Sequence, residues 1–69
     1  MRNTTKLKLI LQHYNIDFSM SEDLEITLTL FDKETGDTED FSGKSYTHLI
    51  SRAYTYFNKR RKEIHRSNY

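Results

Sequence analysis

The stretch Ser45–Ile64, SYTHLISRAYTYFNKRRKEI, decides how the rest of the chain is interpreted. Its apolar residues recur at steps of three and four, which is the repeat of one face of an α-helix. This predicted inner face consists of Tyr46, Leu49, Ile50, Ala53, Tyr54, Phe57 and Ile64. The opposite face is largely basic and consists of His48, Arg52, Thr55, Lys59, Lys62 and Arg66. We expect a long helix, capped by Ser42 or Ser45, that packs its apolar face on the rest of the chain.

Three β-strands are predicted ahead of this helix, at residues 16–20, 24–30 and 38–42. In the first two strands apolar and polar residues alternate, which is typical of a strand with one buried face. Phe41 is the core residue expected in the third strand. A turn over Ser21–Asp23 joins the first two strands. The loop Asp32–Asp37, in which Gly36 can adopt a positive φ, joins the second strand to the third.

Residues 5–14 are open to two interpretations. As a helix, the segment would begin at an N-cap among residues 3–5, end near Asn15 and bury a stripe that consists of Leu7, Ile10, Leu11 and Tyr14. As a strand, the segment would place successive side chains around Leu9 on alternate sides, so that the leucines share one side. The leucine-rich composition favours the helix over the strand.

The length of 69 residues allows one small core and therefore a single domain, residues 1–69. The expected fold class is α+β, in the order α-β-β-β-α, with a three-stranded antiparallel sheet packed on the long C-terminal helix. A chain of this size buries only about 60% of its unfolded surface, so its stability margin is thin. It contains no cysteine, so neither disulfides nor thiolate metal sites stabilise it.

Acidic and basic residues are separated along the chain, although the formal net charge is only +1. Residues 17–40 contain nine acids and one base, and the segments on both sides are basic. We therefore expect an electrically polarised molecule with an acidic middle between basic ends. Charge separation of this kind concerns the partners of a protein rather than its fold.

Motifs for catalysis, nucleotide binding and metal binding all fail on spacing. Gly43-Lys44-Ser45 lacks the glycine that a phosphate-binding loop needs five residues earlier, where Thr38 stands. The loop Asp32–Asp37 begins like a calcium site but lacks the glycine and the glutamate that an EF-hand needs at its sixth and twelfth positions. The three histidines are too far apart in sequence to form a recognisable metal site. We expect no enzyme activity, no metal and no cofactor.

The sequence also predicts no targeting or membrane segment. The longest early apolar run is Leu9-Ile10-Leu11, whereas a signal peptide needs an apolar run of roughly 7 to 15 residues. The hydrophobic content of 35% suffices for a small core and leaves no apolar stretch for a membrane span. We expect a cytoplasmic protein, located in the host cell if its source is a virus.

The run Lys59-Arg60-Arg61-Lys62 predicts a surface that neutralises phosphates. The candidate nucleic-acid-binding residues are Arg52, Lys59, Arg60, Arg61, Lys62 and Arg66. The nucleobases of a bound strand could stack on nearby tyrosines, namely Tyr54, Tyr56 and Tyr69. The same run also suits a solubilising helix end, because cations complement the dipole of a helix at its C-terminus.

The predicted order α-β-β-β-α, with Gly43-Lys44-Ser45 ahead of the last helix, resembles a double-stranded RNA-binding domain. The likeness covers most of the chain at the level of topology. In that family the last helix opens with a lysine cluster that grips phosphates across the groove, and only Lys44 matches it here. Tyr46 and Thr47 follow instead, so the function that the resemblance implies is not carried over.

The acidic stretch has a functional interpretation of its own. Carboxylates along a strand and a hairpin can imitate the phosphates of nucleic acid and fill a basic groove on another protein. Inhibitors of host-defence nucleases that phages carry resemble this chain in style. The candidate protein-binding residues are Glu25, Asp32, Glu34, Asp37, Glu39 and Asp40. The plain structural alternative is that these charges deter aggregation of an exposed sheet edge.

Three functional hypotheses follow from these patterns. The leading one is a non-enzymatic accessory or inhibitor protein, in the style of a phage or mobile element, that binds a larger and nucleic-acid-handling protein. The second is direct nucleic-acid binding through the basic C-terminal helix. The third is a homo-oligomer in which the acidic middle of one copy meets the basic helix of another.

Overall fold

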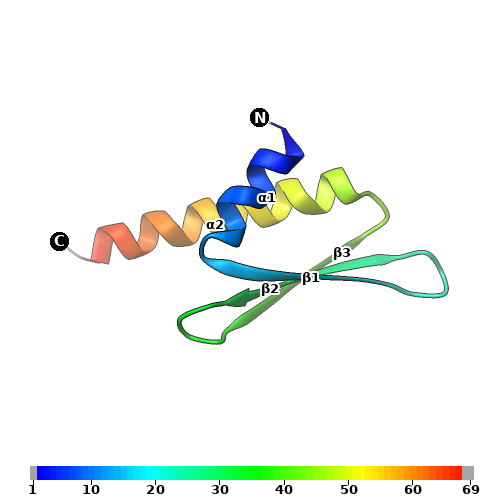
Figure 1. Cartoon of the computed structure of the whole chain (residues 1–69), viewed down its shortest axis with the longest axis horizontal. Coiled ribbons are helices and arrows are strands. Elements are labelled where there is room, and N and C mark those ends of the chain that lie inside the picture. Colours follow the sequence, from blue (N-terminus) through cyan, green and yellow to red (C-terminus); the bar gives the residue numbers. More distant parts are fainter. Residues whose placement is uncertain (1, 68–69) are drawn as a thin grey trace.

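The structure, a computed structural model, describes the backbone of residues 2–67 and the side chains of residues 2–61. Its elements in chain order are α1 (Asn3–Leu11), β1 (Tyr14–Met20), β2 (Ile26–Asp32), β3 (Thr38–Gly43) and α2 (Tyr46–Ser67). The predicted α+β fold with the order α-β-β-β-α is therefore confirmed (Figure 1).

β2 is the central strand of an antiparallel sheet with the order β1-β2-β3, so β1 and β3 form its two edges. At the middle of the sheet, Leu28 pairs with Phe18 of β1 and with Phe41 of β3. Gly36 has a φ of 79° in the loop between β2 and β3, as the turn residues predicted. This short meander fixes which side chains share each side of the sheet.

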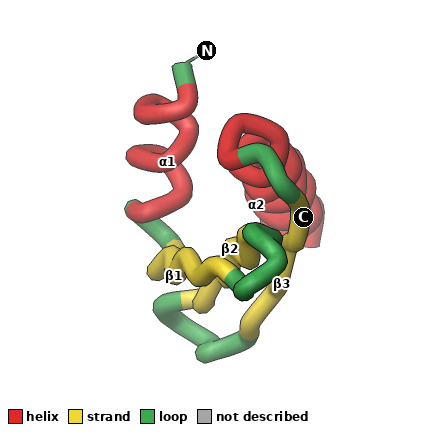
Figure 2. The backbone as a smooth tube through the Cα atoms, turned by 90° about the vertical axis from the view of Figure 1, so that its right-hand side faces the viewer, coloured by secondary structure: helices red, strands yellow, loops and turns green. Residues whose placement is uncertain are grey.

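Both helices lie on the same side of the sheet, and no described element covers the other side (Figure 2). α1 packs against α2 and β1, while α2 packs against β3 and β2. The molecule therefore has two layers, one of helices and one of strands. The core lies between the layers and consists of Ile10, Tyr14, Ile26, Leu28, Leu30, Leu49, Ile50, Ala53 and Phe57.

The inner face predicted for α2 is largely confirmed. Leu49 and Ala53 are fully buried and Phe57 is 3% exposed, because this stripe rests on the sheet. Tyr46 is 51% exposed, so its predicted burial is wrong. It stands at the first turn of the helix, where its ring meets that of Phe18 at a centroid distance of 5.6 Å. The side chain of Ile64 lies outside the described residues.

Ser45 caps α2, in agreement with one of the two predicted caps. Its side-chain Oγ accepts a hydrogen bond from the backbone N–H of His48 at 3.3 Å. α2 is 22 residues long and one of its faces is polar. Among the described residues, no helix is both long and apolar enough to cross a lipid bilayer.

The first element is a helix, but its details differ from the prediction. The helix ends at Leu11, and Tyr14 already belongs to β1, so Asn15 does not end it. Arg2 occupies the N-cap without a side-chain hydrogen bond. Leu11 is 45% exposed, whereas Ile10 is fully buried against α2 and the sheet. Tyr14 is buried as predicted, at 6% exposed, but it is part of β1 rather than of the helix.

The burial predicted for β1 and for the start of β2 is only partly right. Phe18 and Met20 are on the helix side of the sheet, but they are 40% and 51% exposed because β1 is an edge strand. Leu24 was expected inside the second strand, yet β2 begins at Ile26 and Leu24 lies in the preceding turn, 66% exposed. Alternation therefore gave the side of the strand correctly and the extent of the core incorrectly.

Candidate functional site

Charge is divided between the two layers of the molecule. Residues 14–43, here called the sheet layer, carry nine acids and one base. The helices carry no acid at residues 3–11 or 46–61. Their bases in these two ranges are Lys6, Lys8, Arg52, Lys59, Arg60 and Arg61. The two layers therefore carry charge of opposite sign.

The side of the sheet away from the helices, here called the open face, is polar. Paired residues of neighbouring strands share a side of the sheet, so the register assigns to the open face Asn15, Asp17, Ser19, Thr27, Thr29, Phe31, Thr38, Asp40 and Ser42. Thr29 stands between Asp17 and Asp40 in one row across the sheet. Its Oγ1 donates a hydrogen bond of 2.8 Å to Asp40 Oδ1. The open face thus holds two carboxylates and no base.

The six acidic candidates do not form one cluster. Glu25 follows the turn after β1, whereas the loop Asp32–Asp37 lies at the opposite end of β2 (Figure 1). On β3, Glu39 is on the helix side of the sheet and Asp40 is on the open face, because successive strand residues alternate. Asp40 lies on β3 three residues after the loop ends, and Glu25 is at the far end of β2 from both.

Asp32 serves the loop itself. Its Oδ1 accepts hydrogen bonds from the backbone N–H groups of Glu34, at 2.8 Å, and Thr35, at 3.2 Å. These two bonds lower the pKa of the Asp32 carboxyl below its ordinary value, because they stabilise the ionised form. Asp32 is therefore a structural residue of this hairpin, while the exposed Glu34 is better placed to contact a partner.

Arg52 and Lys59 lie on one flank of α2, seven residues apart and hence on the same helical face. They line a shallow groove whose other members are mainly aromatic or hydroxyl-bearing, namely Phe41, Ser45, Thr47, His48, Ser51, Thr55 and Tyr56. The guanidinium of Arg52 lies 5.6 Å from the centroid of the Phe41 ring, and its Nη1 donates a 3.4 Å hydrogen bond to the backbone oxygen of Ser42. Arg52 is thereby held across the edge of the sheet.

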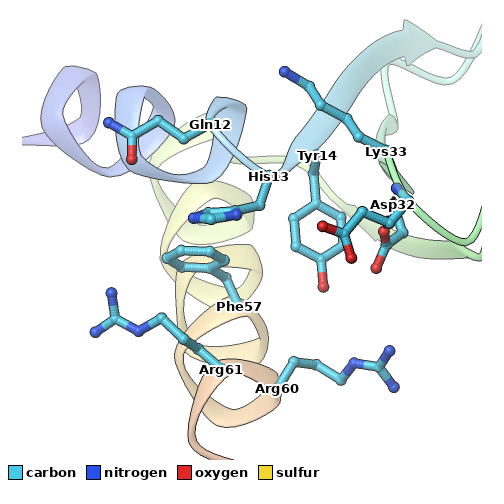
Figure 3. Close-up of a pocket in the computed structure, with 9 residues that line it drawn as sticks. Gln12, His13, Tyr14, Asp32, Lys33, Phe57, Arg60 and Arg61 are labelled. Carbon is cyan, nitrogen blue, oxygen red and sulfur yellow. Dashed lines mark hydrogen bonds between the residues drawn. The ribbon is translucent and has the colours of Figure 1, made fainter. Parts of the chain in front are cut away.

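Arg60 and Arg61 line a different site, a pocket of about 270 Å³ between α2, the β2–β3 loop and the connection from α1 to β1 (Figure 3). The other lining residues are Gln12, His13, Tyr14, Asp32, Lys33, Glu34 and Phe57. The basic run Lys59–Lys62 is thus wound around the helix rather than gathered on one face. The side chains of Lys62 and Arg66 lie outside the described residues.

Phe57 stands at the centre of the contacts in this pocket. The His13 ring stacks on it with a centroid distance of 5.7 Å and an interplanar angle of 29° (Figure 3). The Tyr14 ring meets it edge-on at 6.2 Å, and the guanidinium carbon of Arg61 lies 5.6 Å from its centroid. A cation above an aromatic face is attracted by the ring quadrupole, so this contact holds the Arg61 guanidinium over the ring.

Two further groups in or beside the pocket, Arg60 and Tyr56, have shifted pKa values. The hydroxyl of Tyr14 raises the pKa of the Arg60 guanidinium above its ordinary value. Burial raises the pKa of Tyr56, next to the pocket, above its ordinary value. Both shifts, like that of Asp32, hold the group in the form that it already has at neutral pH. None of the three is placed as a general acid or base for neutral conditions.

Sequence reasoning missed the pocket residues His13, Tyr14 and Lys33. They come from separate elements, and the fold joins them where the backbone N–H of Lys33 donates to the oxygen of His13 at 3.2 Å. The Lys33 ammonium also donates to the backbone oxygen of Leu11 at 2.7 Å. No spacing in the chain signals this meeting. Tyr14 and Phe57 were expected in the interior, as members of the apolar stripes of the two helical segments, but neither was assigned to a site.

No three histidine, aspartate or glutamate side chains lie together as a potential metal site in the part of the chain that the structure describes. The candidate surfaces are therefore the open face with its neighbouring loop, the groove beside Arg52 and the pocket beside Phe57. Comparisons of the chain with protein families, curated proteins and solved structures gave no match.

Proposed function

We propose that the chain is a non-enzymatic binding protein that docks its sheet layer in a basic groove of a larger, nucleic-acid-handling protein. The observation that carries this proposal is the sorting of charge by layer, with nine acids against one base on the sheet layer. A groove built to bind phosphates offers lysines and arginines along its length. An extended surface of carboxylates is complementary to such a groove, and complementarity of this kind governs both specificity and encounter rate.

The open face supplies the regular part of this surface. Asp17 and Asp40 flank Thr29, so their Cα atoms are separated by two strand spacings, about 10 Å. The exposed side chains of Glu34 and Asp37 continue the negative charge beyond the strand ends. The hydroxyl of Thr29 is engaged by Asp40, which holds that carboxylate in place without neutralising its charge.

Reversing three of these charges, with Glu34→Lys, Asp37→Lys and Asp40→Lys in one variant, is expected to abolish binding of the partner. The fold should survive, because all three side chains are exposed. The measurement is capture of the partner from a nuclease-treated lysate of the source cell, followed by calorimetric titration of the captured and purified protein. Duplex DNA should compete with the wild-type chain for that protein.

The matched control reverses two charges of the helix layer, with Arg52→Glu and Lys59→Glu. This variant should bind the partner as the wild type does, since its sheet layer is unchanged. Retention of full affinity by the acidic triple variant, with its circular dichroism spectrum intact, would remove the proposal.

A second candidate function is direct nucleic-acid binding, and the groove on the flank of α2 favours it. Arg52 and Lys59 stand there beside hydroxyl side chains that can bond phosphates and beside the ring of Tyr56. The two remaining basic candidates of this helical face, Lys62 and Arg66, lie beyond the described side chains. Against this candidate, Arg52 is already engaged by Phe41 and by the backbone of Ser42.

For this second function, labelled DNA and RNA should bind at low salt, with an affinity that falls steeply as salt rises. Each phosphate contact contributes about −0.9 to the slope of log K against log salt. Fluorescence anisotropy measures the effect, and the Arg52→Glu, Lys59→Glu variant should lose it while the acidic triple variant should bind more tightly. Absence of a complex at low salt would dispose of this function. The same two variants thus separate the two candidates, because their effects are opposite.

A further inference from the structure

The turn over residues 21–25 forms one end of the molecule, opposite the C-terminal end of α2 (Figure 1). Most of the large apolar side chains that are more than a third exposed gather at this end, and they are Phe18, Met20, Leu24 and Tyr46. Phe18 and Met20 share one side of β1, and the Phe18 ring meets that of Tyr46. We call this group the hairpin tip. Scattered apolar residues are ordinary on a protein surface, but a gathered group marks a contact site.

Leu24 is the most exposed member of the hairpin tip, at 66%, and its backbone is strained. Its φ is 65°, the one positive φ at a non-glycine residue among residues 2–67. Leucine rarely adopts this conformation, because its Cβ approaches the following carbonyl oxygen. A glycine or an asparagine would form the same turn at less cost. A leucine that is strained and largely exposed to water contributes little to the fold and indicates a role outside it.

The turn holds Leu24 in one position. The backbone N–H of Ser21 donates to the oxygen of Glu25 at 2.9 Å, and the N–H of Leu24 donates to the oxygen of Ser21 at 3.0 Å. The Ser21 Oγ also accepts a hydrogen bond from the N–H of Glu25 at 3.2 Å. Because these hydrogen bonds already fix the backbone of the turn, its ordering costs little entropy when Leu24 binds a partner, which suits an anchor residue.

Three acids border the hairpin tip, namely Glu22, Asp23 and Glu25, and all three are exposed. No base occurs between Tyr14 and Asp32. Exposed apolar side chains and acids thus occur together at this end of the sheet, where Lys44 also follows β3. An apolar centre with a charged rim is the usual anatomy of a protein interface. Its complement is an apolar pocket bordered by lysine and arginine.

We infer that Leu24 anchors the protein to its partner by entering an apolar pocket that lysines or arginines border, on the same protein that takes the sheet layer. This inference rests on the proposed function and adds to it a contact that does not depend on charge. Phe18, Met20 and Tyr46 add exposed apolar surface at the same end of the molecule, and Glu25 follows the anchor in the chain. The isolated position of Glu25, far from the other acidic candidates, is explained by this second contact.

The test replaces Leu24 with asparagine, which tolerates a positive φ and removes the apolar side chain. The thermal midpoint should stay the same or rise, while affinity for the purified partner falls about tenfold or more, as for an interface hot spot. Leu24→Gly removes the strain completely and gives a second variant with the same expectation. The control is Leu11→Asn, because Leu11 is also an exposed leucine, at 45%, but lies on α1. It should leave affinity unchanged.

Calorimetric titration of the purified partner distinguishes the outcomes. Wild-type affinity in both Leu24 variants, together with loss of binding in the acidic triple variant, overturns this inference and leaves the proposed function standing. Equal losses of affinity in Leu24→Asn and Leu11→Asn also overturn it, because removing any exposed leucine would then weaken binding. A wild-type chain that binds no protein overturns both the inference and the proposed function.

Discussion

Replacing Phe57 with alanine is expected to lower the melting temperature by about 20 °C and to leave much of the chain unfolded at room temperature. Phe57 is 3% exposed on the sheet-facing stripe of α2. Its ring contacts His13, Tyr14 and Tyr54 with centroid distances between 5.7 and 6.2 Å. These contacts join α2 to the connection between α1 and β1. Removing the ring therefore leaves a cavity where α2 meets the α1–β1 connection and β1.

The magnitude follows from the size of the chain. Truncation of a buried phenylalanine costs about 3–5 kcal/mol, and a domain of this length has a total stability of roughly 3–10 kcal/mol. Thermal unfolding followed by far-ultraviolet circular dichroism measures the change. The control is Tyr46→Ala, which removes another aromatic residue of α2, but one that is 51% exposed. Similar melting temperatures for the two variants would contradict the assignment of Phe57 to the centre of the core.

Replacing Leu28 with alanine is expected to lower the melting temperature by about 15 °C. Leu28 is fully buried at the middle of β2, between Phe18 of β1 and Phe41 of β3. A buried leucine truncated to alanine costs about 3 kcal/mol, because the central strand cannot move to close the space. In a chain without disulfides, no covalent link offsets this loss.

Chemical denaturation gives a second measurement of the Leu28 effect, as a lower midpoint at unchanged slope. The neighbouring substitution Thr27→Ala is the control, because Thr27 is on the open face, where its hydroxyl forms a hydrogen bond with that of Ser42 at 3.3 Å. It should lower the free energy of unfolding by no more than about 1 kcal/mol, and the midpoint should shift correspondingly little. A Leu28 variant as stable as the Thr27 variant would show that the helices do not pack on this side of the sheet.

The fold was predictable from two long patterns. The 3.6-residue repeat of Leu49, Ala53 and Phe57 identified α2, and the alternation about Leu28 identified β2. Both patterns belong to elements that the other layer covers along most of their length. For such elements, pattern and burial coincide, and the prediction holds.

Patterns were less informative at the margins of the molecule. The alternation that includes Phe18 and Met20 is as regular as that of β2, yet both residues are more than a third exposed. Alternation reports the side of a strand on which a residue lies, and it cannot report how far the opposite layer extends. Leu24 continued the same alternation but falls in a turn, where local hydrogen bonds to Ser21 determine the backbone.

The candidate surfaces were predictable only in outline. The segregation of charge along the chain became a segregation by layer because the acidic segment is the one that forms the sheet. That Asp17 and Asp40 share a row with Thr29 depends on strand register, which the sequence did not specify. The pocket beside Phe57 depends on the contact of Lys33 with Leu11 and His13, and it has no counterpart in any sequence motif.

The opposite charges of the two layers give the molecule a dipole moment that its net charge of +1 conceals. The field of a strongly basic partner exerts a torque on such a molecule and turns the strands toward that partner before the surfaces touch. More of the collisions then occur in a productive orientation. Added electrolyte weakens this alignment over distances beyond about 10 Å, so a nearly neutral protein should associate with the salt sensitivity of a highly charged one.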